Sequence, residues 1–289
     1  MNRSHLLVAL IVAALVAASV FAARFIRSGA NNAALLNATQ SGDLGTVQSL
    51  LDAGADPNVR HYPRRPLFDF GRDDGTPAVV VAVAGKHWAV AELLLDRGAV
   101  PPEGGEGIEL LLQATDAGAI GAMRALVDRG VPVDGRAVRH TGYSQPGRTA
   151  LTNAVAYGKA EAAAWLLDHG ASMAPALDRH PTIRFNDFPC SPFGWSAGDN
   201  SGNGAIVRCL VERGLSVDYR HAGGWHNGRP LMAAAVLSGD RALVEYLLDR
   251  GAKVDAKDGQ GWSALYWATI QNRREIAALL EKAGAKKDW

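Results

Sequence analysis

One pentapeptide of the chain has the spacing of a hydrolase nucleophile. Gly194-Trp-Ser-Ala-Gly198 matches the pattern G-x-S-x-G, in which the serine occupies a sharp turn between a strand and a helix. Such chemistry needs a strand in front of the serine and a base and an acid placed beside it. No Val/Ile-rich segment precedes Ser196. We therefore expect no catalytic residue and no enzyme activity, and we keep a serine hydrolase that uses Ser196 as the alternative.

The other ligand-binding patterns are weak. The 8 histidines show no Cys/His spacing of the zinc type, although His140, His221 and His226 could meet across neighbouring loops. The glycine-rich run at 198–204 lacks the Gly-Lys-Ser/Thr ending of a phosphate-binding loop. We therefore expect no metal, no cofactor and no small-molecule substrate.

The chain has 2 cysteines, Cys190 and Cys209. In an oxidising compartment they could form a disulfide. The alternative is a buried small apolar residue at Cys209, where a leucine is usual, and a loop thiol at Cys190. The sequence leaves both possibilities open.

Arginines and aromatic residues form a further set that could do chemistry, because these residue types dominate the energetics of protein interfaces. They gather in four segments, at about 60–72, 136–148, 175–192 and 219–229, which we call the fingers. The candidates for partner binding are Arg64, Arg65, Phe68, Phe70, Arg139, Tyr143, Phe188, Arg220 and Trp225.

The elements that carry the fingers are short helices in pairs. Between residues 229 and 262, an apolar segment (Leu231–Leu237) meets a Ser-Gly break, and a second apolar segment follows at helical spacing. Gly251 then ends the second helix as a glycine that can take a positive φ. Such helices are too short to be stable alone and must cover an apolar face, so the unit predicts neighbouring copies.

Seven copies align on Leu-Leu-Asp-x-Gly. Most copies also have a glycine between their two helices, twelve residues earlier. The terminal glycines are Gly54, Gly98, Gly130, Gly170, Gly214, Gly251 and Gly284. The interhelix position is occupied by Gly42, Lys86, Gly118, Gly158, Gly202, Gly239 and Asn272.

These copies resemble the ankyrin repeat family. The resemblance rests on Gly147-Arg-Thr-Ala-Leu-Thr-Asn-Ala154, on Gly261-Trp-Ser-Ala-Leu-Tyr-Trp-Ala268, and on tails such as Leu248-Asp-Arg-Gly-Ala-Lys-Val-Asp255. It covers about residues 32–289, although Thr76-Pro77 is one residue out of register and copy five is degenerate. The resemblance implies an all-α chain: an ankyrin-type α-solenoid of about seven helix-turn-helix repeats with long hairpin fingers, usually a binding scaffold without chemistry.

All four fingers fall in one phase of the repeat, between a terminal glycine and the next first helix. Because a solenoid places same-phase positions side by side, we expect the fingers to line one edge next to the concave face. The resemblance then implies a scaffold that binds another protein through that face and the fingers. The alternative is that the fingers pack on one another and solvate their charges.

The N-terminus differs from the rest. Leu6 to Ala23 contains no charge, Arg3 precedes it, and Arg24 and Arg27 follow. This length suits a membrane span, so we expect residues 1–27 to form a signal-anchor and linker, with one apolar helix at residues 6–23. A cleaved signal, with processing near Val20–Ala22, and a core helix are the alternatives.

The remaining predictions follow from composition. The net charge is +1, which gives no global attraction to nucleic acid, and we expect no nucleic-acid partner. Residues 28–289 form one repeat domain. We expect a single-pass protein of the inner membrane, of bacterial type, with periplasmic repeats that bind a protein partner; a secreted or periplasmic form after signal cleavage is the alternative. A role in immunity or stress protection is a further alternative that no residue singles out.

Overall fold

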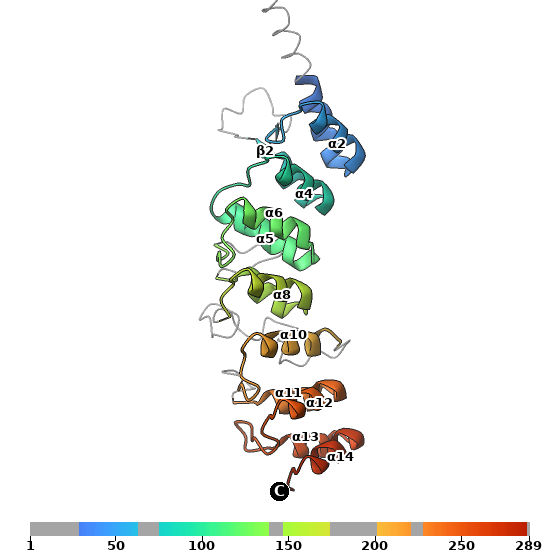
Figure 1. The fold of residues 1–289 in the computed structure, drawn as a ribbon, viewed down its shortest axis with the longest axis vertical. Coiled ribbons are helices and arrows are strands. Elements are labelled where there is room, and N and C mark those ends of the chain that lie inside the picture. The colour runs from blue at the N-terminus through green and yellow to red at the C-terminus, as the bar shows by residue number, and fades with distance from the viewer. Residues whose placement is uncertain (1–28, 63–74, 139–146, 174–200, 221–227, 288–289) are drawn as a thin grey trace, which may run out of the picture. The chain divides into compact units, whose positions relative to one another are not determined.

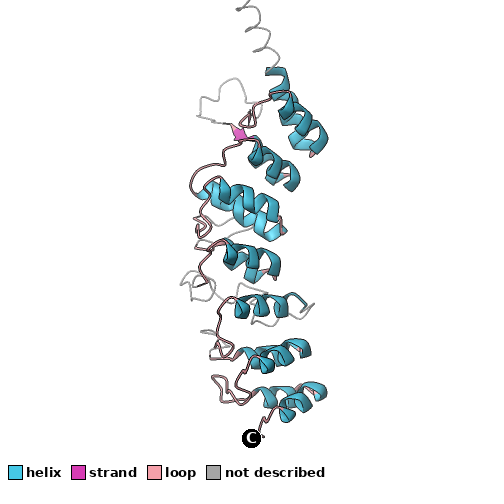
Figure 2. Cartoon of the chain, in the orientation of Figure 1, coloured by secondary structure: helices cyan, strands magenta, loops and turns pink. Residues whose placement is uncertain are grey.

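The computed structural model describes residues 29–62, 75–138, 147–173, 201–220 and 228–287 (Figure 1). Within these ranges nearly all regular structure is helical, as expected for an all-α chain (Figure 2). The chain divides into two compact units, residues 1–103 with 124–130 and residues 104–123 with 131–289. Each unit is described by itself below.

The first unit contains the first two repeats. Residues 29–41 are helical, and a two-stranded antiparallel hairpin lies between the repeats, with Arg60 opposite Pro77 and His61 opposite Thr76. Helix α2 packs on α4, and α3 packs on α4. The bounds are α2 (Leu44–Asp52), β1 (Arg60–His61), β2 (Thr76–Pro77), α3 (Ala78–Ala84) and α4 (Trp88–Asp96).

The second unit contains most of the remaining helices; α6 has residues in both units. First helices pack on first helices, as in α5 with α7 and α11 with α13, and second helices pack on second helices, as in α8, α10, α12 and α14. The bounds are α5 (Gly105–Ala117), α6 (Ile120–Asp128), α7 (Ala150–Ala156), α8 (Ala160–Asp168), α10 (Ser201–Glu212), α11 (Leu231–Ser238), α12 (Arg241–Asp249), α13 (Ala264–Ile270) and α14 (Arg274–Lys282).

Local sequence explains where the helices begin and what they bury. The side chains of Asp43, Thr149, Asp240 and Ser263 each accept a hydrogen bond from the backbone N–H three residues later, which satisfies a donor that the first turn leaves unpaired. The apolar positions then meet in the core. In α12, for example, Leu243, Val244 and Leu247 are buried, as their helical spacing predicts.

The turns confirm the alignment of the repeats. All seven terminal glycines have positive φ, from 80° at Gly251 to 106° at Gly214. Four interhelix glycines do so as well, and Lys86 (59°) and Asn272 (54°) adopt the same left-handed conformation in their place. A side chain is rarely found there, so these two residues show that the turn geometry is set by the repeat rather than by the residue.

The prediction for Gly202 is wrong. This residue lies within α10, which begins at Ser201, rather than in a turn between two helices. A glycine permits a left-handed turn but does not require one, and in the first turn of a helix its N–H needs no partner inside the helix. The segment expected to form the first helix of copy five lies at 174–200, outside the described residues.

Candidate partner-binding surface

Each described finger base is an antiparallel stem at the predicted phase of the repeat. The pairing is made by backbone hydrogen bonds on either side of the inserted residues. The paired positions are Arg60 with Pro77, Ala137 with Arg148, Arg220 with Pro230, and Asp258 with Trp262. At these four junctions the repeat therefore places a hairpin stem between a terminal glycine and the next first helix, whereas the described connection from Gly98 to α5 shows no such pairing.

Three arginines hold these stems closed. Each stands six residues after a terminal glycine and donates from Nη1 to the carbonyl of the glycine on the other side of the stem. The pairs are Arg60 with Gly75 (3.1 Å), Arg136 with Gly147 (3.4 Å) and Arg220 with Gly228 (3.0 Å). Every residue has a main-chain carbonyl, so the sequence does not show which one accepts a hydrogen bond from an arginine. The bonding of these arginines across the stems was therefore not predicted.

The stem arginine Arg220 is the candidate partner-binding residue that the structure describes. Its Nη1 also donates to the carbonyl of Lys257, and this bond links the sixth-repeat stem to the seventh. Its role in binding stays a prediction. The other candidates, together with Cys190 and Ser196, lie outside the described residues: Arg64, Arg65, Phe68, Phe70, Arg139, Tyr143, Phe188 and Trp225.

A second regular contact, which we call the rung, connects successive repeats next to the stems. An Asp or Asn four residues after one terminal glycine accepts a hydrogen bond from the backbone N–H two residues after the next one. The rungs are Asn58 with Val100 (2.8 Å), Asp134 with Ser172 (2.9 Å), Asp218 with Lys253 (2.8 Å) and Asp255 with Lys286 (3.0 Å). These Asn and Asp side chains therefore already accept hydrogen bonds from the backbone of the next repeat.

Aromatic residues cluster on the seventh repeat. The Trp262 ring stacks on Tyr266 with centroids 4.0 Å apart and planes 11° apart, and Trp267 meets Tyr266 edge-on at 5.6 Å. The indole N–H of Trp267 donates to Asp258 Oδ2 at 2.8 Å, which fixes that ring. Trp262 is 36% exposed and Ile270, at the end of the same helix, is 54% exposed. This cluster was absent from the sequence-based candidates.

Arg229 lies against this cluster. Its guanidinium carbon is 5.9 Å from the Trp267 ring centroid, and burial lowers the pKa of the group. Its Nε is buried and has no acceptor among the described residues. Asp258, the acidic group whose charge acts on Arg229, is instead saturated by the N–H groups of Gln260, Trp262 and Trp267.

A polar chain lies inside the repeat stack between α5 and α7. Arg148, only 4% exposed, donates to Asn153 Oδ1 at 3.1 Å, and Asn153 donates to Asp116 Oδ1 at 3.1 Å. Burial raises the pKa of Asp116 to about 6, although the Asn153 amide and the charge of Arg148 oppose that shift. Arg148 was grouped with the second finger in the sequence, but it is part of the core.

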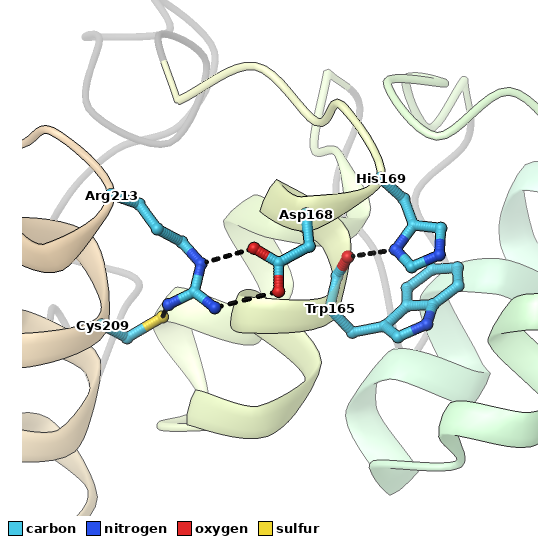
Figure 3. Close-up of polar contacts among 5 residues, drawn as sticks. All are labelled: Trp165, Asp168, His169, Cys209 and Arg213. Carbon is cyan, nitrogen blue, oxygen red and sulfur yellow. Dashed lines mark hydrogen bonds and ion pairs between the residues drawn. The ribbon is translucent and has the colours of Figure 1, made fainter.

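The neighbourhood of Cys209 does not form a nucleophilic site. Arg213 binds both carboxylate oxygens of Asp168, at 2.9 and 3.0 Å, and its Nη1 lies 3.5 Å from Cys209 Sγ (Figure 3). His169 lies on the other side of Asp168, stacked on Trp165 at 3.9 Å, so this nearby histidine is not placed to accept the thiol proton (Figure 3). Burial raises the pKa of the Cys209 thiol, which keeps it protonated.

The described residues contain neither a metal-ligand cluster nor a helix suited to cross a membrane. No group of three or more His, Cys, Asp or Glu residues in these ranges could hold a metal ion. No helix in the described part of the chain has the length and apolarity that crossing a membrane requires. The expected span at residues 6–23 lies outside that part and remains a prediction.

Paired helices with same-phase stems and regular rungs define a helical repeat protein of the solenoid class. Residues 193–288 match a family model described as ankyrin repeats (3 copies), and these residues correspond to copies five to seven. The resemblance to ankyrin repeats that the sequence shows is thereby confirmed for residues 193–288.

A solved structure supports the fold over a longer range. The crystal structure of the human ASB11 ankyrin repeat domain matches with a TM-score of 0.52 and 22% identity, covering 88% of this chain and 98% of that chain. At this identity the likeness concerns the fold alone. A comparison with curated proteins gives no match.

Proposed function

We propose that this protein is a scaffold without catalytic activity that binds another protein along its hairpin edge, through the fingers and the face formed by the first helices. Ankyrin repeats in general serve protein–protein interaction. The observation that carries the proposal is the construction of the stems. Arg60, Arg136 and Arg220 brace hairpins at one phase of the repeat, so the first, second and fourth fingers start from equivalent positions.

The location of the partner follows from the N-terminus. The uncharged run from Leu6 to Ala23 supports a membrane anchor, with the repeat domain held outside the cytoplasm. A reporter that is active only outside the cytoplasm, fused after residue 289, should be active with the full chain and inactive when residues 1–28 are removed. Activity without those residues would contradict this part of the proposal.

The binding proposal is tested by crosslinking and capture from an envelope extract. A first-finger variant carries Arg64, Arg65, Phe68 and Phe70 as alanine. Because aromatic and arginine side chains supply most interface energy, we expect this variant to lose the captured partner. The matched control replaces Arg241 and Arg274 by alanine, two arginines at the start of second helices α12 and α14. Identical capture by the wild type and the finger variant would contradict the assignment.

A further inference from the structure

The stems of the sixth and seventh repeats adjoin each other. Arg220 bonds to the Lys257 carbonyl, and a Cβ built on Gly228 would lie 3.3 Å from the backbone of Gly259. Arg229 is thereby brought against the aromatic cluster of the next repeat. We call Arg229, Trp262, Tyr266 and Trp267 the C-terminal aromatic edge.

We infer that the C-terminal aromatic edge binds an acidic segment of the partner protein, with Arg229 pairing with a carboxylate and Trp262 packing on an adjacent proline or aromatic ring. This inference rests on the proposed function. It states which kind of partner segment the C-terminal aromatic edge binds. It differs from the finger candidates because it uses residues of the stems and first helix of the last two repeats.

The guanidinium of Arg229 supplies the preference for an anion. Among the described residues it has no carboxylate within salt-bridge distance, although it is half-buried and has a buried N–H without an acceptor. A partly desolvated charge without a partner is costly, and a carboxylate that pairs with the two terminal Nη groups lowers that cost, although it does not reach the buried Nε. Neither Asp258 nor the rung residues Asp218 and Asp255 meet this need, because backbone or indole N–H groups engage them.

The aromatic residues supply the preference for a flat apolar neighbour. Trp262 and Tyr266 stack nearly parallel, and Trp262 keeps about a third of its surface exposed. Rings held in this way are surfaces on which proline or aromatic side chains pack, as in the recognition of proline-rich segments by aromatic grooves. Trp267 is fixed by Asp258, so the edge is formed before a partner arrives.

A protein segment fits this edge better than a nucleic acid does. Arginine beside stacked aromatic rings could also receive a base and a phosphate. However, Asp218, Asp255 and Asp258 alternate with the cations of the same stems, and the whole protein has a net charge of only +1, so the stems offer no continuous cationic track for a chain of phosphates. A short segment with one or two carboxylates needs no such track.

The test uses the full chain and a displayed library of random twelve-residue peptides. We expect selected peptides to be enriched in Asp or Glu next to Pro, Phe, Tyr or Trp. Fluorescence anisotropy of the labelled peptides should show affinity reduced at least about tenfold by Arg229→Gln, because charge-assisted bonds are lost. Arg229→Lys should give a smaller loss, since it keeps the charge but not the planar pair of donors. Trp262→Ala should weaken the same peptides.

The matched control is Arg208→Gln. Arg208 in α10 also lies over an aromatic ring, Tyr246 at 5.6 Å, and also has a buried Nε without an acceptor, but it lies on the second helices. It should leave peptide affinity unchanged. Selection without acidic enrichment, equal peptide affinity for wild type and Arg229→Gln, or tighter binding of a single-stranded 20-nucleotide thymidine oligomer than of any peptide would each overturn the inference.

Capture of the natural partner separates this inference from the proposed function. If the first-finger variant loses the partner while Arg229→Gln retains it fully, the inference is overturned and the scaffold function stands. If no partner is captured by any form, the scaffold function fails, whereas peptide selection still reports on the edge alone.

Discussion

Two arginines of the second compact unit, one in the fifth repeat and one in the sixth, meet very different surroundings. Arg213, on the second-helix side, forms a two-bond ion pair with Asp168 of the preceding repeat (Figure 3). Arg229, at a hairpin stem, faces the ring of Trp267 and has no carboxylate partner in the described residues. On the second-helix side the charge of Arg213 is neutralised within the fold. On the stem side the charge of Arg229 is left for a ligand. Residue type alone therefore does not identify a binding residue.

Arg148 and Arg229 occupy equivalent positions, because each directly follows a stem glycine, Gly147 or Gly228. Arg148 differs from Arg229 in being buried. Arg148→Met should lower the free energy of unfolding by about 2–4 kcal/mol, since it removes a buried donor to Asn153 and the cation near Asp116. Urea unfolding followed by circular dichroism measures this. Arg136→Met is the control, with an exposed side chain and one long bond, and should have little effect. If the Arg148 variant were as stable as the wild type, Arg148 would not differ from Arg229 in its contribution to folding.

The buried chain also predicts a pH effect. The pKa of Asp116 is about 6 in the fold and 3.8 ordinarily, so its protonated form favours folding at low pH, and that contribution is lost as pH rises through 6. Asp116→Asn keeps the acceptor for Asn153 without this loss. The urea midpoint of the Asp116→Asn variant, relative to that of the wild type, should therefore be higher at about pH 7.5 than at about pH 5. A constant difference at both pH values would show that Asp116 does not titrate in this window.

The Arg213–Asp168 pair should contribute less, because exposed ion pairs are weak. Arg213 holds the pKa of Asp168 below its ordinary value, so the contribution is present above that value and is lost as pH falls. We expect Arg213→Gln to lower Tm slightly at low ionic strength, and about 0.5 M salt to shrink the difference. Asp168→Asn and the double variant should give the same Tm as Arg213→Gln. Additive losses would mean that the two residues act separately.

Arg229→Gln should have the smallest effect on folding. Among the described residues the guanidinium would lose the contact with the Trp267 ring and the charge of Asp258, so the free energy of unfolding should change by less than about 1 kcal/mol. Thermal and urea unfolding of this variant beside the Arg148 variant completes the comparison. A loss as large as that of Arg148→Met would make Arg229 a structural residue and would contradict its assignment to a partner.

The repeats could be predicted from the sequence because their signals are local. The terminal glycines mark turns with positive φ, and Lys86 and Asn272 were placed in such turns by counting residues alone. The site could be predicted only in outline. Arg148 and Arg229 look alike in the sequence, and only packing separates the buried one from the half-exposed one.

Two other features were missed for different reasons. Arg60, Arg136 and Arg220 bind main-chain carbonyls, which every residue has, so no pairing pattern shows in the sequence. The aromatic cluster did have a signal, since Gly261-Trp-Ser-Ala-Leu-Tyr-Trp267 carries three large aromatic residues within seven positions. These residues lie outside the four fingers, so the repeat phase that selects the fingers does not select them.

The rungs have a consequence for how such a chain can change its length. Each rung joins a side chain that precedes the stem to a main-chain N–H two residues after the next terminal glycine, so neither of its partners is a residue of the finger. Any residue except proline supplies that N–H. Residues can thus be added to or removed from a finger without altering the spacing of the helices behind it. Under the proposed function, the helices and rungs set the spacing while the fingers bind the partner, and each finger is then a replaceable module.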